Sequence, residues 1–359
     1  MKRILVVKIR SFGDVVLAGP CFAALRRAYP KAWITLLTAP PSHELLKATG
    51  WANEVFAYNK AALDRQPLLL KWLKGFRMDM ELRARRFDLA LDLYGSHRSA
   101  RLVRASRAPV QVGLDIPETK GFYHLRAGAD DRLTVSVREL DRRVLRFAEV
   151  DVSDEEIWPV PPEADAMAGR FFLSSGFTDD DLVVAINPFA SCVTKEWGAA
   201  KWGEVAAELS AVGIKVFFTC APMERGRLVE IEIAAGSRFP SYSNSSLLPL
   251  LGLYQRCRAV LSCDSGPRHL AAAVGTPTLT VWGPERPSRW HPYPPEKHPI
   301  VIKDVPCRPC GLSVCVDRNH ECMVAVKPDT VLKELKRLLR GSEPGQKAKT
   351  KGKKFDKTI

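Results

Sequence analysis

Short apolar runs alternate with helical patterns along most of the chain, and this alternation constrains the fold more than any single motif. In the first half the apolar runs are 4–7, 33–37, 54–58 and 89–93, and the helical patterns between them are 15–29, 42–47, 67–86 and 96–106. Pairs of this kind form βα units on a parallel sheet. Residues 110–113 extend the set as a strand and 137–150 as a helix, and Pro20 predicts a kink or a late start within 15–29.

A second alternating series follows a change in composition. Residues 151–165 hold three prolines and six acids without helical periodicity, which is typical of a linker. Beyond them strands are predicted at 182–187, 215–219, 259–262 and 278–282, and helices at 199–211, after Pro222, and at 246–256, 266–274 and 328–339. A chain of 359 residues is long enough for two cores. We therefore predict an α/β protein of two doubly wound, Rossmann-like domains, 1–160 and 161–340, which face each other across a cleft.

The charge of the chain restricts its partners. The formal net charge is +14, of which residues 340–359 contribute +5 through seven Lys/Arg against Glu343 and Asp356. We predict that the Lys-rich tail 341–359 is disordered. The remaining positive charge favours an anionic partner, which is a phosphorylated substrate, an acidic membrane surface or a nucleic acid.

The apolar content restricts the cellular setting. Of the residues 46% are hydrophobic, yet no apolar run reaches the roughly 18 residues that span a bilayer. Lys8 and Arg10 interrupt the first apolar run, so the amino terminus lacks the pattern of a secretory signal. We therefore expect a cytoplasmic protein.

The segment AVLSCDSGPRHLAAAVGTP, residues 259–277, carries the strongest sign of a ligand site. A predicted strand ends at Cys263, and a helix of small residues begins directly after it. The free N–H groups at the start of that helix make Ser265 and Gly266 an anion site at the carboxyl end of a strand. The alternative is that Asp264 or Ser265 only caps the helix, which leaves His269 beside the same strand end unexplained.

The opening stretch KIRSFGDVVLAGP, residues 8–20, has a similar strand-to-helix turn with a different composition. It contains one glycine before Asp14, whereas a dinucleotide-binding fingerprint needs three. A carboxylate beside a helix amino terminus is stabilised in its ionised form and is available as a base. The alternative is that Asp14 merely caps its helix.

Three separated stretches together resemble glycosyltransferase family 9, the ADP-heptose:lipopolysaccharide heptosyltransferases. They are residues 4–30, ILVVKIRSFGDVVLAGPCFAALRRAYP; residues 185–209, AINPFASCVTKEWGAAKWGEVAAEL; and the segment DSGPRHLAAAVGTP with the apolar strand and Gly-Pro that follow it. The resemblance implies a GT-B fold of two Rossmann-like domains, with the sugar nucleotide held mainly by the second. It implies ADP-heptose as donor and the phosphorylated lipopolysaccharide inner core, linked to lipid A, as acceptor.

The resemblance also assigns roles to individual residues. Asp14 matches the general base, which removes the proton from the acceptor hydroxyl as it attacks. Lys195 matches the lysine that meets the diphosphate leaving group, although a lone lysine is more often a solvated surface residue. Glu224 matches a glutamate beside the adenosine ribose, and its alternative role is that of a first-turn helix acid. The nucleotide-sugar residues are then Ser191, Thr194, Lys195, Glu224, Asp264, Ser265, Gly266 and His269.

Basic residues in the first domain favour an acceptor surface. The stretches KWLKGFRMDMELRARR, 71–86, and YGSHRSARLVRASR, 94–107, are rich in Lys and Arg. We predict that this region meets the phosphates of the acceptor, and the alternative is a solvated, Arg-rich helical face. The acceptor-binding residues predicted here are Ser11, Gly13, Ser96, His97, Arg98 and Arg101.

Four cysteines cluster late in the chain with the spacing C-x2-C-x4-C-x6-C, at Cys307, Cys310, Cys315 and Cys322. Structural thiols, a redox-dependent disulfide and a metal site all remain open for this cluster. The transfer itself needs no metal or cofactor, because Lys195 and the helix amino termini supply the positive charge. We therefore predict no metal.

Several positions depart from the pattern of the family. Phe189 stands where a glycine is common, Cys220 and Ala221 stand where a glycine pair is common, and Arg10 stands in the serine pair after Lys8. These changes bear on the donor that is accepted. The sequence predicts an inverting glycosyltransferase in peripheral contact with the inner membrane; the alternatives are a sugar-nucleotide epimerase of the same fold and a basic nucleic-acid-binding protein.

Overall fold

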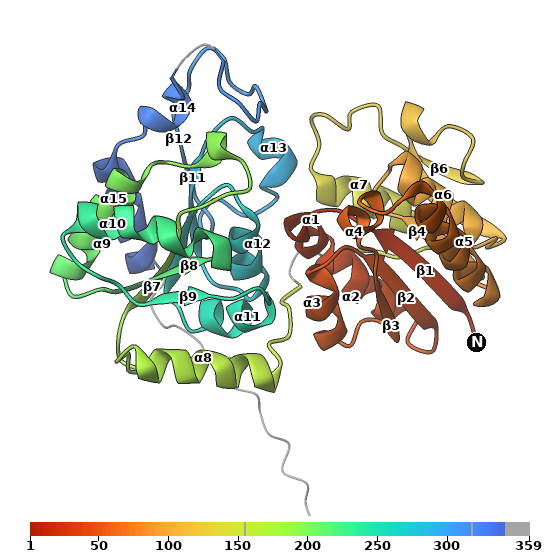
Figure 1. Cartoon of the computed structure of the whole chain (residues 1–359), viewed down its shortest axis with the longest axis horizontal. Helices are drawn as coiled ribbons and strands as arrows, with labels where there is room; N and C mark the ends of the chain where they lie inside the picture. The colour runs from red at the N-terminus through yellow and green to blue at the C-terminus, as the bar shows by residue number, and fades with distance from the viewer. Residues whose placement is uncertain (154–155, 317–318, 342–359) are drawn as a thin grey trace, which may run out of the picture.

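The computed structural model describes residues 1–153, 156–316 and 319–341. It shows two α/β units side by side, each built on one sheet with helices packed against it (Figure 1). No helix in these residues combines the length and the apolar character that crossing a bilayer requires. The predicted fold class, two Rossmann-like α/β units, is therefore confirmed by the sheets described next.

The first unit contains a six-stranded parallel sheet in the order β3-β2-β1-β4-β5-β6. The central strand β1 is buried from Ile4 to Lys8, and Val6 pairs with Leu36 on one side and Leu91 on the other. Its strands are β1 (Arg3–Lys8), β2 (Trp33–Thr38), β3 (Glu54–Ala57), β4 (Leu89–Asp92), β5 (Val110–Asp115) and β6 (Leu125–Gly128).

The second unit contains another six-stranded parallel sheet, in the order β12-β11-β10-β7-β8-β9. Its central strands β7 and β10 are buried at every position, which is typical of a parallel sheet covered on both faces. Its strands are β7 (Val183–Asn187), β8 (Lys215–Cys220), β9 (Ser241–Ser243), β10 (Ala259–Cys263), β11 (Thr278–Trp282) and β12 (Ile300–Ile302).

The two sheets have the same strand order when each is numbered from its own first strand. In both, the first strand is central and the fourth lies beside it. Strands one to three extend the sheet toward one edge and strands four to six toward the other, so the order of addition reverses between the first and fourth strands. Ligands of open α/β sheets bind at the carboxyl ends of the strands at such a switch point. The fold thus offers two candidate sites, one after β1 and β4 and the other after β7 and β10.

Most of the longer helices lie where the sequence predicts them, with α8 as the exception. A break at Ala18 separates α1 from α2, and Pro20 lies in the first turn of α2, so the predicted late start is confirmed. The helices of the first unit are α1 (Phe12–Leu17), α2 (Gly19–Ala28), α3 (Ser42–Ala48), α4 (Lys60–Asp64), α5 (Leu68–Ala84), α6 (His97–Ala105), η1 (Pro117–Thr119) and α7 (Val137–Arg146). The remaining helices are α8 (Pro162–Ser174), η2 (Val193–Lys195), α9 (Ala199–Ala211), η3 (Pro222–Arg227), α10 (Leu228–Ala235), α11 (Leu248–Gln255), α12 (Gly266–Ala273), α13 (Pro287–Trp290), α14 (Glu321–Val324) and α15 (Pro328–Gly341).

The predicted linker 151–165 extends too far at its carboxyl end. Pro162 begins α8, and Asp165 lies within that helix. The physical reason is that proline fits the first turn of a helix, and Glu163 and Asp165 complement the positive end of the helix dipole. The tail 342–359 lies outside the described residues, and the division of the domains at residue 160 stays a prediction.

The linker also supplies a side chain that joins the two units. The Trp158 backbone N–H donates to Ala273 O in α12 at 2.8 Å. Its buried indole packs edge-on against Trp51, with ring centroids 4.9 Å apart. A Cβ on Gly19 would lie 2.2 Å from Trp158 Nε1, so α2 approaches the indole more closely than any other residue at position 19 allows. Trp158 therefore contacts both units.

Candidate active site

The amino termini of α1 and α12 meet, and this contact joins the two switch points. A Cβ built on Gly266 would lie 2.1 Å from Cζ of Phe12, and one on Gly13 would lie 3.2 Å from the Gly266 Cα. Glycine at both positions lets the two helix ends approach. The segment after β1 and the segment after β10 are therefore neighbours in space, although they are far apart in the sequence.

Asp14 lies in the first turn of α1 and is only 5% exposed. The Ser11 hydroxyl donates a hydrogen bond to its Oδ2. Its Oδ1 accepts no hydrogen bond from the described residues and lies 3.2 Å from Arg10 Nε. Asp14 thus has one hydrogen-bonded oxygen and one that faces only a guanidinium.

Arg10 connects Asp14 with both units. Its guanidinium carbon lies 5.7 Å from the centroid of the Tyr94 ring in the first unit and 5.1 Å from that of the Trp290 ring in the second. Cation–π attraction at these distances holds the guanidinium between the two rings. Arg10 therefore orients Asp14 and contacts the second unit at the same time.

A buried ion pair supports the end of β1 behind Asp14. Lys8 Nζ lies 2.7 Å from Asp141 Oδ2 in α7, and Lys8 also donates to Leu93 O at the end of β4. Burial raises the pKa of the Asp141 carboxyl to about 6; Lys8 opposes this shift, and the negative charge of Asp14 adds to it. Lys8 thereby ties the ends of β1 and β4 to α7.

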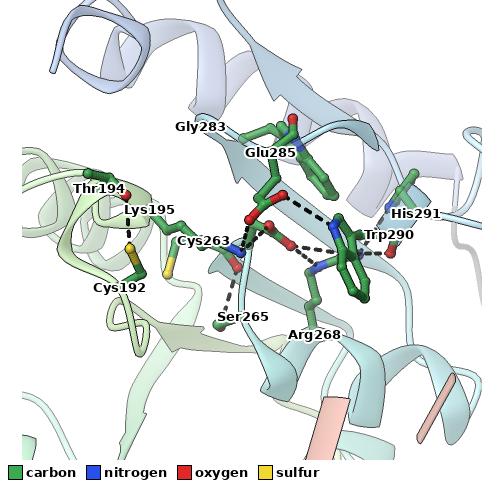
Figure 2. A network of polar contacts seen from close by, with 12 residues as sticks. Cys192, Thr194, Lys195, Cys263, Ser265, Arg268, Gly283, Glu285, Trp290 and His291 are labelled. Carbon is green, nitrogen blue, oxygen red and sulfur yellow. Dashed lines mark hydrogen bonds and ion pairs between the residues drawn. The ribbon is translucent and has the colours of Figure 1, made fainter. Parts of the chain in front are cut away.

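Lys195 is the centre of the polar network at the second switch point. Its Nζ lies 3.1 Å from Asp264 Oδ2 and 3.3 Å from Glu285 Oε1 (Figure 2). Burial lowers the pKa of Lys195, but the charges of Asp264 and Glu285 outweigh it, so the net shift is upward. Lys195 therefore remains a cation whose position is fixed by two carboxylates.

Arg268 holds the opposite side of Asp264. Its fully buried guanidinium donates to Asp264 Oδ1 at 3.1 Å and to Trp290 O at 2.7 Å. Asp264 is consequently engaged on both oxygens, by Lys195 and by Arg268. Its side chain orients cations and is not available to cap α12.

The remaining donor-side residues are distributed around this network. Ser265 is the residue before α12 and makes no capping hydrogen bond; its hydroxyl donates to Asn187 Oδ1 at 3.1 Å. Ser191 is exposed, whereas Thr194 is buried and donates to Leu312 O at 2.7 Å. Glu224 Oε2 accepts from the Ala221 N–H at 2.8 Å, which is the helix-terminal alternative foreseen for it.

His269 lies in the contact between the two units. Its Nδ1 is 2.7 Å from Tyr293 Oη, and its Cδ2 would lie 3.2 Å from a Cβ on Gly13. Burial, with a smaller contribution from the Arg268 charge, holds the pKa of His269 well below its usual range. The imidazole is therefore neutral at physiological pH and packs against the turn that carries Asp14.

The predicted acceptor residues fall into two groups. Ser11 and Gly13 lie at α1 beside Asp14, and Ser96 caps α6 through a reciprocal pair of hydrogen bonds with Ser99. His97, Arg98 and Arg101 line a cavity of about 730 Å³ between α4, α5 and α6.

Both arginines of this cavity are paired. Arg98 lies 3.1 Å from Asp64 in α4, and Arg101 lies 2.6 Å from Asp79 in α5. Each of the two guanidiniums thus lies beside one carboxylate at the wall of the cavity.

The sequence reasoning missed Arg10, Glu285, Arg289 and Trp290 as members of the site. Arg289 lies near Asp14, and its pKa is lowered first by burial and then by the charge of Arg10. The available signal was the run GPERPSRW directly after β11, since charged and aromatic residues that follow a buried parallel strand lie at the ligand-binding edge of the sheet.

The loop that carries the cysteine cluster packs against this network, because Arg308 donates to Gly283 O at 2.7 Å and the Gly311 N–H donates to Pro284 O at 3.1 Å. Cys307, Cys310 and Cys315 are exposed and Cys322 is buried, and all four are free thiols. Burial raises the pKa of Cys322, and the neighbouring cysteines add to the shift. Among the described residues, no three His, Cys, Asp or Glu side chains are arranged to hold a metal ion. The need for a metal stays untested.

Comparison with known proteins gives consistent similarities. Residues 76–321 match the sequence profile of glycosyltransferase family 9 (heptosyltransferase). Lipopolysaccharide heptosyltransferase 3 of Escherichia coli is 28% identical over 299 residues, which are 79% of this chain and 84% of that protein.

Solved structures show the same fold. A glycosyl transferase family 9 protein from Veillonella parvula superposes with a TM-score of 0.79 at 22% identity, over 95% of this chain and 97% of that one. Escherichia coli heptosyltransferase WaaC with ADP superposes with a TM-score of 0.72 at 19% identity, over 94% and 99%.

Proposed function

The chain belongs to glycosyltransferase family 9, the heptosyltransferase family, and from this membership we propose that it transfers a heptose from ADP-heptose to the lipopolysaccharide inner core. The observation that carries the proposal is the meeting of the two switch points. A buried carboxylate, Asp14, lies in α1 at one. At the other, the cation Lys195 of η2 is held by Asp264 just before α12, whose end touches that of α1. Transfer to a hydroxyl needs these two groups, a base for the acceptor and a positive charge for the leaving group.

Asp14 acts as the general base. The Ser11 hydroxyl fixes Oδ2, which leaves Oδ1 to receive the proton of the acceptor hydroxyl. That hydroxyl reaches Oδ1 by displacing Arg10 from its 3.2 Å contact. The attack inverts the configuration at the anomeric carbon because the nucleophile and the leaving group lie on opposite faces.

Lys195 stabilises the diphosphate as it leaves. A protonated amine held by Asp264 and Glu285 needs no reorganisation when negative charge develops beside it. The N–H groups at the start of α12 add positive charge at the same edge of the sheet. Ser191, Ser265 and Gly266 complete the nucleotide-sugar site, with Glu224 through the carboxylate oxygen that does not accept from the Ala221 N–H, while Thr194 and His269 support it by packing.

The acceptor approaches along the first unit. Arg98 and Arg101 line the cavity beyond the end of β4, where phosphates of the inner core can replace Asp64 and Asp79 as their partners. This route agrees with work at the cytoplasmic face of the inner membrane, where the lipid A-linked acceptor is held. Nucleic acid has no part in it, and no metal is needed while Lys195 carries the charge.

The deciding experiment incubates ADP-heptose with lipopolysaccharides of successively truncated core and follows ADP release and product mass. We expect ADP release that depends on one truncated acceptor, with a product heavier by one heptose. Release without any acceptor dependence, across several sugar nucleotides, would contradict the transferase. Turnover of the nucleotide sugar alone would instead indicate an epimerase.

The basic tail allows a second check. A chain that ends at residue 341 keeps its transfer activity if the tail is not the functional element. Two results together would favour the nucleic-acid alternative. The full chain binds nucleic acid with a steep salt dependence that the shortened chain loses, and neither protein transfers a sugar.

A further inference from the structure

Helix α5 exposes the kind of surface that a folded domain normally buries. Of its seventeen residues only Leu82 is buried. The exposed fractions are 86% for Leu68, 69% for Leu69, 65% for Trp72 and 55% for Phe76. Such a cluster of large apolar side chains on one helix marks an interaction surface.

These side chains form a single stripe. Leu68, Trp72, Phe76 and Met80 follow one another at four-residue spacing, and Leu69 and Leu73 lie beside them. The Trp72 and Phe76 rings stack, with centroids 5.8 Å apart and an interplanar angle of 12°. Leu82 supplies the buried contact of the helix, and the side chains of the stripe remain exposed.

Basic residues surround the stripe. The segment from residue 60 to residue 86 carries eight Lys/Arg against three acids. Lys74 and Arg77 are exposed on the helix itself, and Arg77 pairs only loosely with Glu81, at 3.4 Å. A helix that exposes Trp, Phe and Leu beside Lys and Arg suits the interface of an anionic bilayer.

The helix also lies where a membrane-held acceptor would arrive. Figure 1 shows α5 at the outer edge of the first unit, beside α6 and away from the second sheet. Leu68, Trp72 and Phe76 of the stripe line the same cavity as Arg98 and Arg101. A bilayer in contact with the stripe would therefore lie next to the acceptor route.

We propose that the α5 stripe, formed by Leu68, Leu69, Trp72, Leu73, Phe76 and Met80, inserts into the interface of an anionic lipid bilayer. This deepens the proposed function, on which it rests, by naming the surface that brings the enzyme to a lipid-linked acceptor.

Two other occupants fit the surface less well. A second copy of the chain would bring Lys74 and Arg77 of both copies together, which costs electrostatic energy. The tail of the chain is Lys-rich and would be repelled by the same residues. An anionic bilayer satisfies both the apolar and the positive part of the surface.

The test measures sedimentation of the full chain with vesicles. Vesicles of phosphatidylglycerol and phosphatidylethanolamine supply the anionic surface, and phosphatidylcholine vesicles are the neutral reference. The variant Leu69→Glu/Leu73→Glu changes the stripe outside the residues that line the cavity. The matched control is Leu173→Glu/Ile233→Glu, since these two apolar residues are 80% and 75% exposed on α8 and α10.

We expect the full chain and the control to bind anionic vesicles and the α5 variant to bind at least about tenfold more weakly. Transfer to a deacylated, water-soluble core acceptor stays unchanged in the α5 variant, whereas transfer to an acceptor within vesicles falls. Vesicle binding is measured without turnover, so a failed transferase assay and a failed docking assay are distinguishable.

Equal vesicle binding by the α5 variant and the unchanged chain would overturn the proposal, as would no vesicle binding by the unchanged chain. A dimer in sedimentation equilibrium that the α5 substitutions dissociate, without any lipid effect, would assign the stripe to a second copy instead. Circular dichroism melting of the variant confirms that the exposed substitutions leave the fold intact.

Discussion

The two switch points share one topology and carry opposite chemistry. Both sheets have the same strand order, and in each the candidate site follows the first and fourth strands. In the first unit this place holds the carboxylate Asp14 with Arg10 as its counter-ion; in the second it holds the cation Lys195 with two carboxylates. Topology thus provides the location, and the side chains alone decide the chemistry.

The two units also differ in their buried titratable groups. The second unit holds the buried His269 and His298 and the half-buried His291 in their neutral forms, because burial lowers the pKa of each. The first unit buries the ion pair of Lys8 and Asp141. We therefore expect acid to lower the free energy of unfolding through the histidines of the second unit and to raise it through Asp141 of the first.

The largest effect is expected from Asp14→Asn. The amide cannot take up the proton of the acceptor hydroxyl, so kcat falls about 10³-fold. ADP affinity, measured by titration calorimetry, stays unchanged because the substitution lies at the first switch point. An equal loss of ADP affinity would break the division of roles between the two units.

The next effect is expected from Lys195→Ala. Removing the cation weakens ADP binding and lowers kcat/KM about 10²-fold, since the diphosphate loses its charge partner. The control is Lys215→Ala, an exposed lysine at the start of β8 in the same unit. ADP binding as tight as in the unchanged chain would place the diphosphate elsewhere.

The third effect is the dependence of the free energy of unfolding on pH, to which His298 contributes. The ring of His298 is buried, and its Nδ1 lies 3.0 Å from Thr278 Oγ1. Burial lowers the pKa of His298 to about 3. An unfolded histidine titrates near about 6.5, so the unfolded chain takes up the proton first. The stability that His298 contributes is therefore complete above about pH 6.5 and is lost as the pH falls toward 3.

At pH 5 this loss amounts to about 2 kcal/mol. Urea denaturation at pH 7 and at pH 5 gives the drop in the free energy of unfolding between these two pH values. We expect this drop to be about 2 kcal/mol smaller in His298→Gln than in the unchanged chain. Asp141 has the opposite sign, because burial raises its pKa to about 6, so its contribution is present at low pH and is lost as the pH rises through 6. An unchanged pH dependence in the variant would contradict a neutral, buried His298.

The smallest effect is expected from Arg10→Ser, which removes the residue that contacts Asp14, Tyr94 and Trp290. Because Arg10 positions the base without touching the donor, kcat falls about tenfold and the KM for donor stays unchanged. Arg10→Lys restores part of the loss. Arg126→Ser, an exposed arginine paired with Asp115, serves as the control. A rise in kcat would show that Arg10 blocks Asp14 more than it orients it.

Much of the fold was predictable because buried parallel strands and amphipathic helices leave a local record. The strand at 278–282 and the helix at 199–211 match β11 and α9 residue for residue. The missed strands β6, β9 and β12 are short edge strands, and three or four residues contain no period to detect. Helix α8 was missed because Pro162 was counted with the linker prolines.

The candidate site was predicted in part for a similar reason. Asp264 was visible because it directly follows a strand that the apolar pattern defines, and Asp14 because it lies in the helix turn that comes next after such a strand. Glu285 was not, since nothing in its local sequence reveals that it meets Lys195, ninety residues earlier in the chain. Ion pairs of this kind depend on strand order in the sheet, which local periodicity does not encode.

By itself the sequence determined two series of βα units, the residues at the strand ends and the positive charge of the chain. These properties depend on neighbours within a few residues of each other, so a linear pattern suffices to encode them. Only the tertiary structure decided that Gly13 and Gly266 bring the two helix ends into contact, and that Arg10 lies between Tyr94 and Trp290. It alone left the apolar stripe of α5 exposed, because whether a helix face is buried depends on what the rest of the chain packs against it.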